Sequence, residues 1–134
     1  MRGEPKVIDR LKRAKRDQLF MSAVSLAEIE YGIARLPHGP RGPSKRSEEL
    51  RELFESLQTY VEVAAWDRLA AKRYATVRTE SEAAGLAIDQ ADMMIAAHAS
   101  SMEATLVTAE RTLLRRPRAH WMPPAVNWLA RGAG

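Results

Sequence analysis

The sequence predicts an α/β domain with a parallel sheet. Short apolar runs of strand length recur along the chain, and between them apolar residues recur at the three- and four-residue spacing of helices. Strands that alternate with helices in this way are typical of parallel sheets. The 134 residues are enough for one domain with a sizeable core, so we expect residues 1–134 to form a single domain.

The first half of the chain divides at apolar runs and prolines. Residues 7–14 have helical apolar spacing, so the chain is expected to open within a helix. The run Leu19–Val24 (LFMSAV) predicts a buried strand that ends at Ser25. Leu26–Leu36 carries the next helical stripe, and Pro37–Pro43 (PHGPRGP) predicts a loop because it is rich in proline and glycine.

The second half continues the alternation. Leu50–Leu57 predicts a helix and Tyr60–Ala64 a short strand. Asp67 is placed to cap a long helix, and Gly85 suits the position just after its end. The remaining expected elements are a helix capped by Asp89, a strand at Ala104–Thr108 and a short strand around Val126.

Composition narrows the class of protein. Because there is no cysteine, disulfides, thiolate zinc sites and cysteine nucleophiles are excluded, which fits a reducing cytoplasm. No apolar stretch is long enough to span a membrane, and the charged start does not resemble a signal peptide. The net charge of +4 and the pI of about 9.8 favour polyanionic partners, although solvated helix faces explain single basic clusters equally well.

Carboxylates at the junctions between strands and helices are the candidate functional residues. Glu28 follows the first predicted strand, Asp92 begins the helix after Asp89, and Glu110 follows the strand Ala104–Thr108. Acids that converge from separate strand ends can hold Mg²⁺ or Mn²⁺, which activates water for phosphodiester hydrolysis. The chain shows no nucleophile motif and no glycine-rich phosphate loop.

A structural explanation exists for the same acids. Ser25 and Glu28 have the spacing of a capping box, in which the glutamate satisfies the amide of the capping residue. Asp89 and Asp92 lie at a helix N-terminus, where the helix dipole favours negative charge. Spacing alone therefore leaves both interpretations open.

Four segments resemble PIN-domain ribonucleases of the VapC toxin kind. Met21–Ile33 (MSAVSLAEIEYGI) is similar to a strand that leads into S-x-x-S/T-x-x-E-[LI]-x-x-G. Asp67–Ala99 contains A-x-x-Y-A-x-x-R, a glycine and D-x-x-I-A-A-H-A. Thr105–Leu114 (TLVTAERTLL) resembles T-L-V-T-x-N/D-x-x-x-F, and Asn127–Trp128 the closing N-W. The ordered set is more specific than any one motif.

The resemblance implies a three-layer α/β/α fold of the PIN kind and a set of roles. Glu28 falls on the second acid of the family and Asp92 on the third, so both are expected catalytic metal ligands. Glu110 falls on the fourth position, where the family usually has Asn or Asp, with Thr108 beside it. Asp89 is expected to cap its helix. The family further implies Mg²⁺- or Mn²⁺-dependent RNA cleavage, a homodimer and a VapB-like antitoxin as partner.

One departure concerns the start of the chain. Members of the family begin with a strand ending in aspartate, whereas this sequence begins at what matches the later part of the first helix. The expectation is thus a truncated domain whose first, central strand and first metal ligand are absent, since Asp9 lies mid-helix. Three functions follow: a ribonuclease toxin, a catalytically inactive PIN remnant that binds antitoxin or RNA, or an unrelated basic helical nucleic-acid-binding protein.

Overall fold

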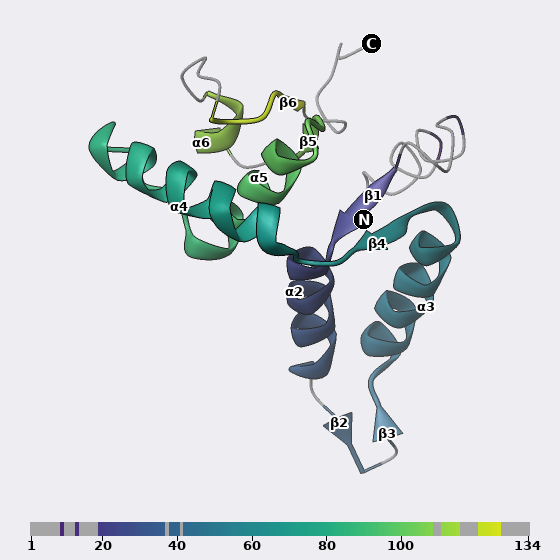
Figure 1. The fold of residues 1–134 in the computed structure, drawn as a ribbon. Coiled ribbons are helices and arrows are strands. Elements are labelled where there is room, and N and C mark those ends of the chain that lie inside the picture. Colours follow the sequence, from purple (N-terminus) through teal and green to yellow (C-terminus); the bar gives the residue numbers. More distant parts are fainter. Residues whose placement is uncertain are drawn as a thin grey trace. The chain divides into compact units, whose positions relative to one another are not determined.

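The computed structural model divides into two compact units (Figure 1). One unit comprises residues 8–64, and the other residues 65–134 together with 1–7. The single domain predicted for residues 1–134 stays a prediction. The residues that the structure describes are 9, 13, 19–36, 38–40, 42–108, 111–115 and 121–126.

The unit of residues 8–64 is a parallel strand pair with two helices. Strand β1 pairs with β4 in parallel, with Met21 opposite Val63. Helix α2 packs against α3 and both strands. Among the described residues, the buried hydrophobic side chains of this unit are Ile33 on α2 and Phe54 on α3. The main elements are β1 (Phe20–Ser22), α2 (Ala23–Ala34), α3 (Lys45–Tyr60) and β4 (Glu62–Ala64).

The junction between β1 and α2 differs from the prediction. Ser22 has extended backbone and caps α2, because its Oγ accepts a hydrogen bond from the Val24 N–H at 3.1 Å. The predicted strand up to Val24 is therefore too long, and Ser25 lies inside the helix. Alanine and valine are compatible with a helix start, so the earlier of the two serines ends the strand.

The predicted loop at 37–43 contains a small hairpin. Strand β2 (His38–Gly39) pairs antiparallel with β3 (Gly42–Pro43), and Gly42 has φ +99°, a conformation that glycine adopts without strain. Helix α3 follows and is longer than predicted. It is capped by Ser44, whose Oγ accepts from the Ser47 N–H at 3.1 Å, and it includes Tyr60, which was expected in the next strand.

The unit of residues 65–134 is built around two packed helices. Helix α4 packs along α5, and strand β5 pairs with β6 in parallel, with Leu106 opposite Ala125 (Figure 1). The elements are α4 (Arg68–Ala83), α5 (Gln90–Ser101), β5 (Leu106–Val107), α6 (Arg111–Leu114) and β6 (Ala125–Val126). The buried core cluster comprises Val77, Ala96, Ala97, Leu106, Leu113, Trp121 and Met122.

Both predicted ends of α4 are confirmed. Asp67 Oδ1 accepts a hydrogen bond from the Ala70 N–H at 2.9 Å. Gly85 has φ +70°, and the N–H of Leu86 reaches back to the Ser81 carbonyl at 2.9 Å. This pattern is the Schellman ending, in which a left-handed residue satisfies the last carbonyls of a helix.

Strands and helices alternate and the main strand pairs are parallel, as predicted. In the described part of the chain, the parallel pairs are β1 with β4 in one unit and β5 with β6 in the other, and each of these strands is two or three residues long. No helix among the described residues is long and apolar enough to cross a membrane.

Candidate metal centre

Glu28 lies on α2 in the unit of residues 8–64, and its side chain is exposed. It is the sixth residue of the helix, beyond the first turn, because the cap is Ser22. The capping-box explanation for this glutamate is therefore wrong. No hydrogen bond or ion pair joins its carboxylate to another described residue. Among the described residues, Glu28 therefore has neither a capping role nor an ion-pair role.

Asp92 lies in the first turn of α5, in the unit of residues 65–134, and is half-buried. Asp89 occupies the capping position, where its backbone carbonyl accepts from the Met93 N–H at 2.9 Å. Its side chain, however, makes no capping hydrogen bond, so the expected role of Asp89 as a side-chain cap is wrong. Two carboxylates thus stand at one helix N-terminus, where the dipole stabilises negative charge.

Glu110 lies outside the described residues, as do Asn127 and Trp128. Thr108, which the family resemblance places beside Glu110, is described and half-buried. Its backbone N–H donates to the Val126 carbonyl at 3.0 Å, directly after β5. The strand end that leads to Glu110 is therefore defined, while the glutamate itself stays a predicted ligand.

The candidate ligands are distributed over both units. Glu28 belongs to residues 8–64 and Asp92 to residues 65–134, and each is placed within its own unit. Within the described part of the chain, no group of three His, Asp or Glu side chains is close enough to hold a metal ion. Carboxylate oxygens are nevertheless the donors that hard cations such as Mg²⁺ prefer. The donor chemistry of the two acids fits the predicted metal.

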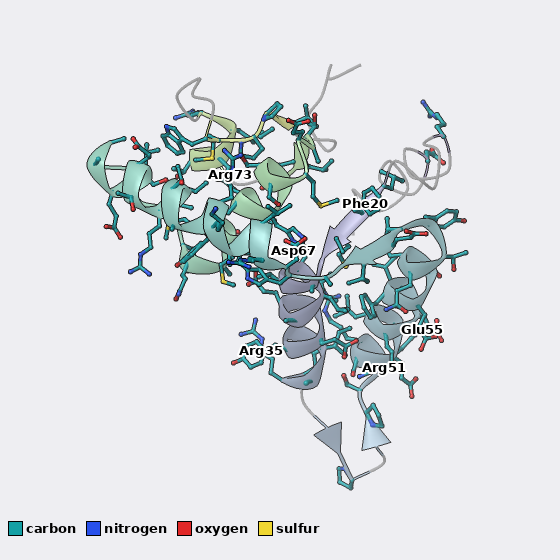
Figure 2. The ribbon with its side chains drawn as sticks, in the orientation of Figure 1. Phe20, Arg35, Arg51, Glu55, Asp67 and Arg73 are labelled. Atoms are coloured by element: carbon teal, nitrogen blue, oxygen red, sulfur yellow. The ribbon has the colours of Figure 1, made fainter. Side chains whose placement is uncertain are left out.

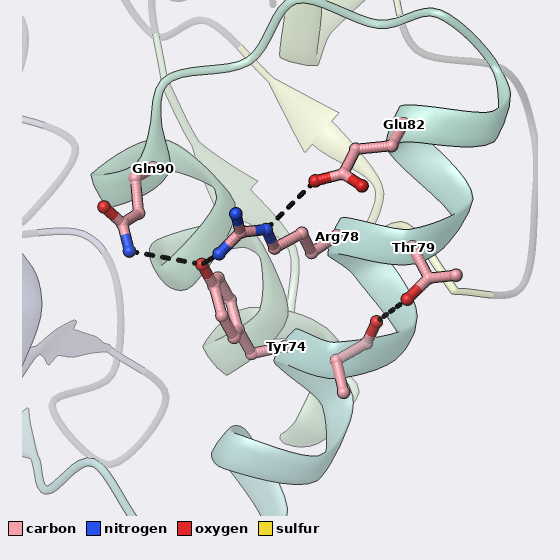
Figure 3. A network of polar contacts seen from close by, with 6 residues as sticks. Tyr74, Arg78, Thr79, Glu82 and Gln90 are labelled. Atoms are coloured by element: carbon pink, nitrogen blue, oxygen red, sulfur yellow. Dashed lines mark hydrogen bonds and ion pairs between the residues drawn. The ribbon is translucent and has the colours of Figure 1, made fainter.

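A polar network on α4 was missed by the sequence interpretation (Figure 3). The Tyr74 hydroxyl accepts hydrogen bonds from Arg78 Nη1 at 3.2 Å and from Gln90 Nε2 at 3.4 Å. Arg78 Nε also donates to Glu82 at 3.0 Å. The hydrogen bond to Glu82, followed by that to Tyr74, raises the pKa of Arg78. The four-residue spacing of Tyr74, Arg78 and Glu82 was the available signal, since residues four apart are neighbours on a helix.

A second missed feature is an aromatic contact at the other end of α5. His98 is buried, and its ring meets that of Trp66 edge to face, with centroids 5.5 Å apart and planes at 72°. Trp66 also meets Tyr74 edge to face at 6.3 Å. The histidine of the D-x-x-I-A-A-H-A segment is thus a packing residue beside the start of α4.

The profile of the PIN domain family matches residues 1–119. The chain belongs to the PIN-domain family. The plasmid stability protein StbB of Pseudomonas syringae pv. tomato is 35% identical to this PIN domain over 114 residues, which cover 81% of this chain and 78% of that protein. Ribonuclease VapC2 of Rickettsia felis is 32% identical over 95 residues, covering 71% of this chain and 65% of that protein.

Solved structures agree with this assignment. The VapBC2 structure from Rickettsia felis, bound to a DNA fragment from its promoter, contains a chain with 29% identity and a TM-score of 0.66, covering 81% of this chain and 74% of that one. DNA-bound VapBC from Salmonella typhimurium shares the fold, with a TM-score of 0.72, 24% identity, and coverage of 92% and 84%. The VapC-type resemblance and the α/β PIN fold are confirmed.

Proposed function

We propose that this PIN domain is the metal-dependent ribonuclease toxin of a toxin–antitoxin pair. The supporting relationship is to ribonuclease VapC2, and the supporting observation in this chain is Glu28. Glu28 is exposed, lies beyond the cap of α2 and bonds to no other described residue. An acid that coincides with a family acid, and that has no capping or ion-pair role among the described residues, favours a ligand role over a structural one.

Glu28 and Asp92 would hold Mg²⁺ or Mn²⁺, with Glu110 as the further ligand from the position after Thr108. The cation supplies an activated water and stabilises the charge that builds on the phosphate. Asp92 stands in the first turn of α5, where the helix dipole favours negative charge. Glu28 is exposed, so its carboxylate oxygens can be reached by a cation from solvent.

We infer that the partners are an RNA substrate, a VapB-like antitoxin and a second copy of the chain. Support for the antitoxin comes from the related VapBC2 structure of Rickettsia felis. Support for RNA comes from the ribonuclease relative and from the net charge of +4, which favours a polyanion. The same proposal places the protein in the cytoplasm, with no membrane partner.

The test is cleavage of an end-labelled RNA by the purified chain with Mg²⁺ or Mn²⁺ and with EDTA. We expect Asp92→Asn and Glu28→Gln each to lower the cleavage rate by about a hundredfold or more, since loss of even outer groups around a metal costs about 10- to 100-fold. Glu80→Gln is the matched control, because Glu80 is an exposed acid on α4 outside the proposed site. Undiminished cleavage by Asp92→Asn, or cleavage in EDTA, would contradict the proposal.

A catalytically inactive PIN domain that binds antitoxin or RNA is the second candidate. It is favoured by the glutamate at position 110, where the family usually has Asn or Asp. The same experiment separates the two functions. If RNA is retained on a filter by the chain but stays intact at every Mg²⁺ and Mn²⁺ concentration, the binding function replaces the enzymatic one.

A further inference from the structure

The first two turns of α4 carry three cations that have no ion-pair partner among the described residues. Arg68 and Lys72 are exposed and Arg73 is half-buried. No hydrogen bond or ion pair joins any of them to another described residue. Figure 2 labels Arg73 on this helix. We call Arg68, Lys72 and Arg73 the α4 basic cluster.

Sequence spacing leaves the α4 basic cluster without intrahelical compensation. No acid stands three or four residues before or after any of its members, although this is the spacing at which helical side chains meet. Arg68 and Lys72 are themselves four residues apart, a spacing at which like charges on a helix repel each other. Arg68 also lies in the first turn, where the helix dipole disfavours a positive charge.

Helix α3 shows the opposite arrangement. Each of its three cations has a glutamate three or four residues away, as is usual for a solvated helix face. Arg51 and Glu55, labelled in Figure 2, are one such pair, four residues apart. The cations of α3 are Lys45, Arg46 and Arg51, and the acids at those spacings are Glu48, Glu49 and Glu55. The uncompensated charge on α4 is therefore a local property of that helix.

We propose that the α4 basic cluster binds the phosphate backbone of single-stranded RNA. Phosphates supply the missing negative charge, and such contacts dominate the affinity of proteins for nucleic acids. Two apolar groups border the cluster: Leu69, which is 63% exposed, and the partly exposed ring of Trp66. Apolar and aromatic side chains among cations suit unpaired bases. The identity of the ligand rests on the ribonuclease function proposed above.

The experiment measures binding rather than cleavage. A fluorescein-labelled oligouridylate is titrated with the full chain in EDTA, by polarisation, over a range of salt concentrations. The test variant is Arg68→Gln/Lys72→Gln/Arg73→Gln, and the control is Lys45→Gln/Arg46→Gln/Arg51→Gln on α3. The two variants lose the same formal charge.

The quantity compared is the slope of the logarithm of the binding constant against the logarithm of the salt concentration. Each lost phosphate contact lowers its magnitude by about 0.7, so the slope of the α4 variant should be smaller by about 2. The affinity of this variant for the RNA should be at least about tenfold weaker. The α3 variant should bind within about twofold of the parent. Equal losses in both variants, or no loss in the α4 variant, would overturn the proposal. Polyglutamate is titrated in the same way as a model of an acidic protein. If the α4 variant binds RNA as the parent does but no longer binds polyglutamate, the ligand of the cluster is an acidic protein partner and not RNA.

Folding is checked on the same variants by thermal unfolding. Because Arg68 and Lys72 repel each other and Arg68 opposes the helix dipole, the α4 variant should unfold at or above the temperature of the parent. A lower unfolding temperature would show that the fold uses these cations and would count against the proposal. Absence of cleavage by the parent chain would refute the ribonuclease function but leave this binding comparison intact.

Discussion

The hydroxyl of Ser22 accepts a hydrogen bond from the backbone N–H of Val24 at 3.1 Å, and this contact fixes where α2 begins. Two serines compete for this role in the sequence, and the second, Ser25, has the spacing of a capping box with Glu28. Since the first serine is the cap, Glu28 is displaced from the helix start into the body of the helix. A structural explanation for the glutamate is thereby removed.

The cap can be tested by comparing the two serines. We expect Ser22→Ala to lower the free energy of unfolding by about 1 kcal/mol, because an N–H at the helix start loses its acceptor. Ser25→Ala, inside the helix, should change it by less than about 0.5 kcal/mol. Urea unfolding followed by circular dichroism measures both. A larger loss in Ser25→Ala than in Ser22→Ala would restore the capping box.

A buried hydroxyl in α4 predicts a stabilising substitution. Ser81 is fully buried, and its Oγ has no hydrogen-bond partner among the described residues. An unsatisfied buried polar group costs about 1–3 kcal/mol, so Ser81→Ala should raise the free energy of unfolding by about 1 kcal/mol. Ser81→Val serves as the control, because extra volume in this packed position should cost about 1–3 kcal/mol. Destabilisation by the alanine would indicate a hydrogen bond formed in solution.

The ends of α4 and α5 use the same turn with different residues. Gly85 has φ +70°, whereas Glu103, in the equivalent position after α5, has φ 53° and is the one non-glycine residue with positive φ in the described part of the chain. Glu103→Gly should therefore stabilise the protein by about 0.5–1 kcal/mol, and Gly85→Ala should destabilise it by about the same amount. Differential scanning calorimetry measures the unfolding temperature of both variants. If both substitutions move the unfolding temperature in the same direction, the two positions are not equivalent.

Burial in the core cluster predicts how much each of two leucines contributes to the stability of the fold. Leu113, on the short helix α6, is 2% exposed and belongs to the core cluster. Leu113→Ala should therefore lower the free energy of unfolding by about 2–5 kcal/mol. Leu69 is 63% exposed, so Leu69→Ala should lower the free energy of unfolding by less than about 0.5 kcal/mol. Chemical denaturation of the two variants is the measurement. Similar losses would mean that Leu69 is covered in solution.

Local rules predicted those parts of the fold that depend on neighbours in the sequence. Asp67 and Gly85 were assigned correctly because a cap and a left-handed ending each involve only a few consecutive residues. The choice between Ser22 and Ser25 failed because both precede residues that suit a helix. The hairpin of β2 and β3 was missed because two-residue strands are too short to show a period.

The candidate site was predictable only as a set of residue types. Acids after strands and at helix starts are visible in the sequence, and Asp92 does stand in the first turn of its helix. Whether Glu28 and Asp92 converge depends on elements far apart in the chain, and spacing carries no information on that. The uncompensated cations of α4 are visible as a pattern, and the predicted cap at Asp67 already places them in the first two turns of the helix.

The close packing of α4 on α5 also bears on the order in which the molecule forms. The two helices are consecutive in the chain and joined by a short connection, so their contacts close only a small loop and have a low entropic cost. Pairing of β5 with β6 must bridge a longer intervening segment that includes α6. The helical pair is therefore expected to be the early nucleus of its unit. Asp92, at the start of α5, would then take its place on a frame that exists before the strands assemble.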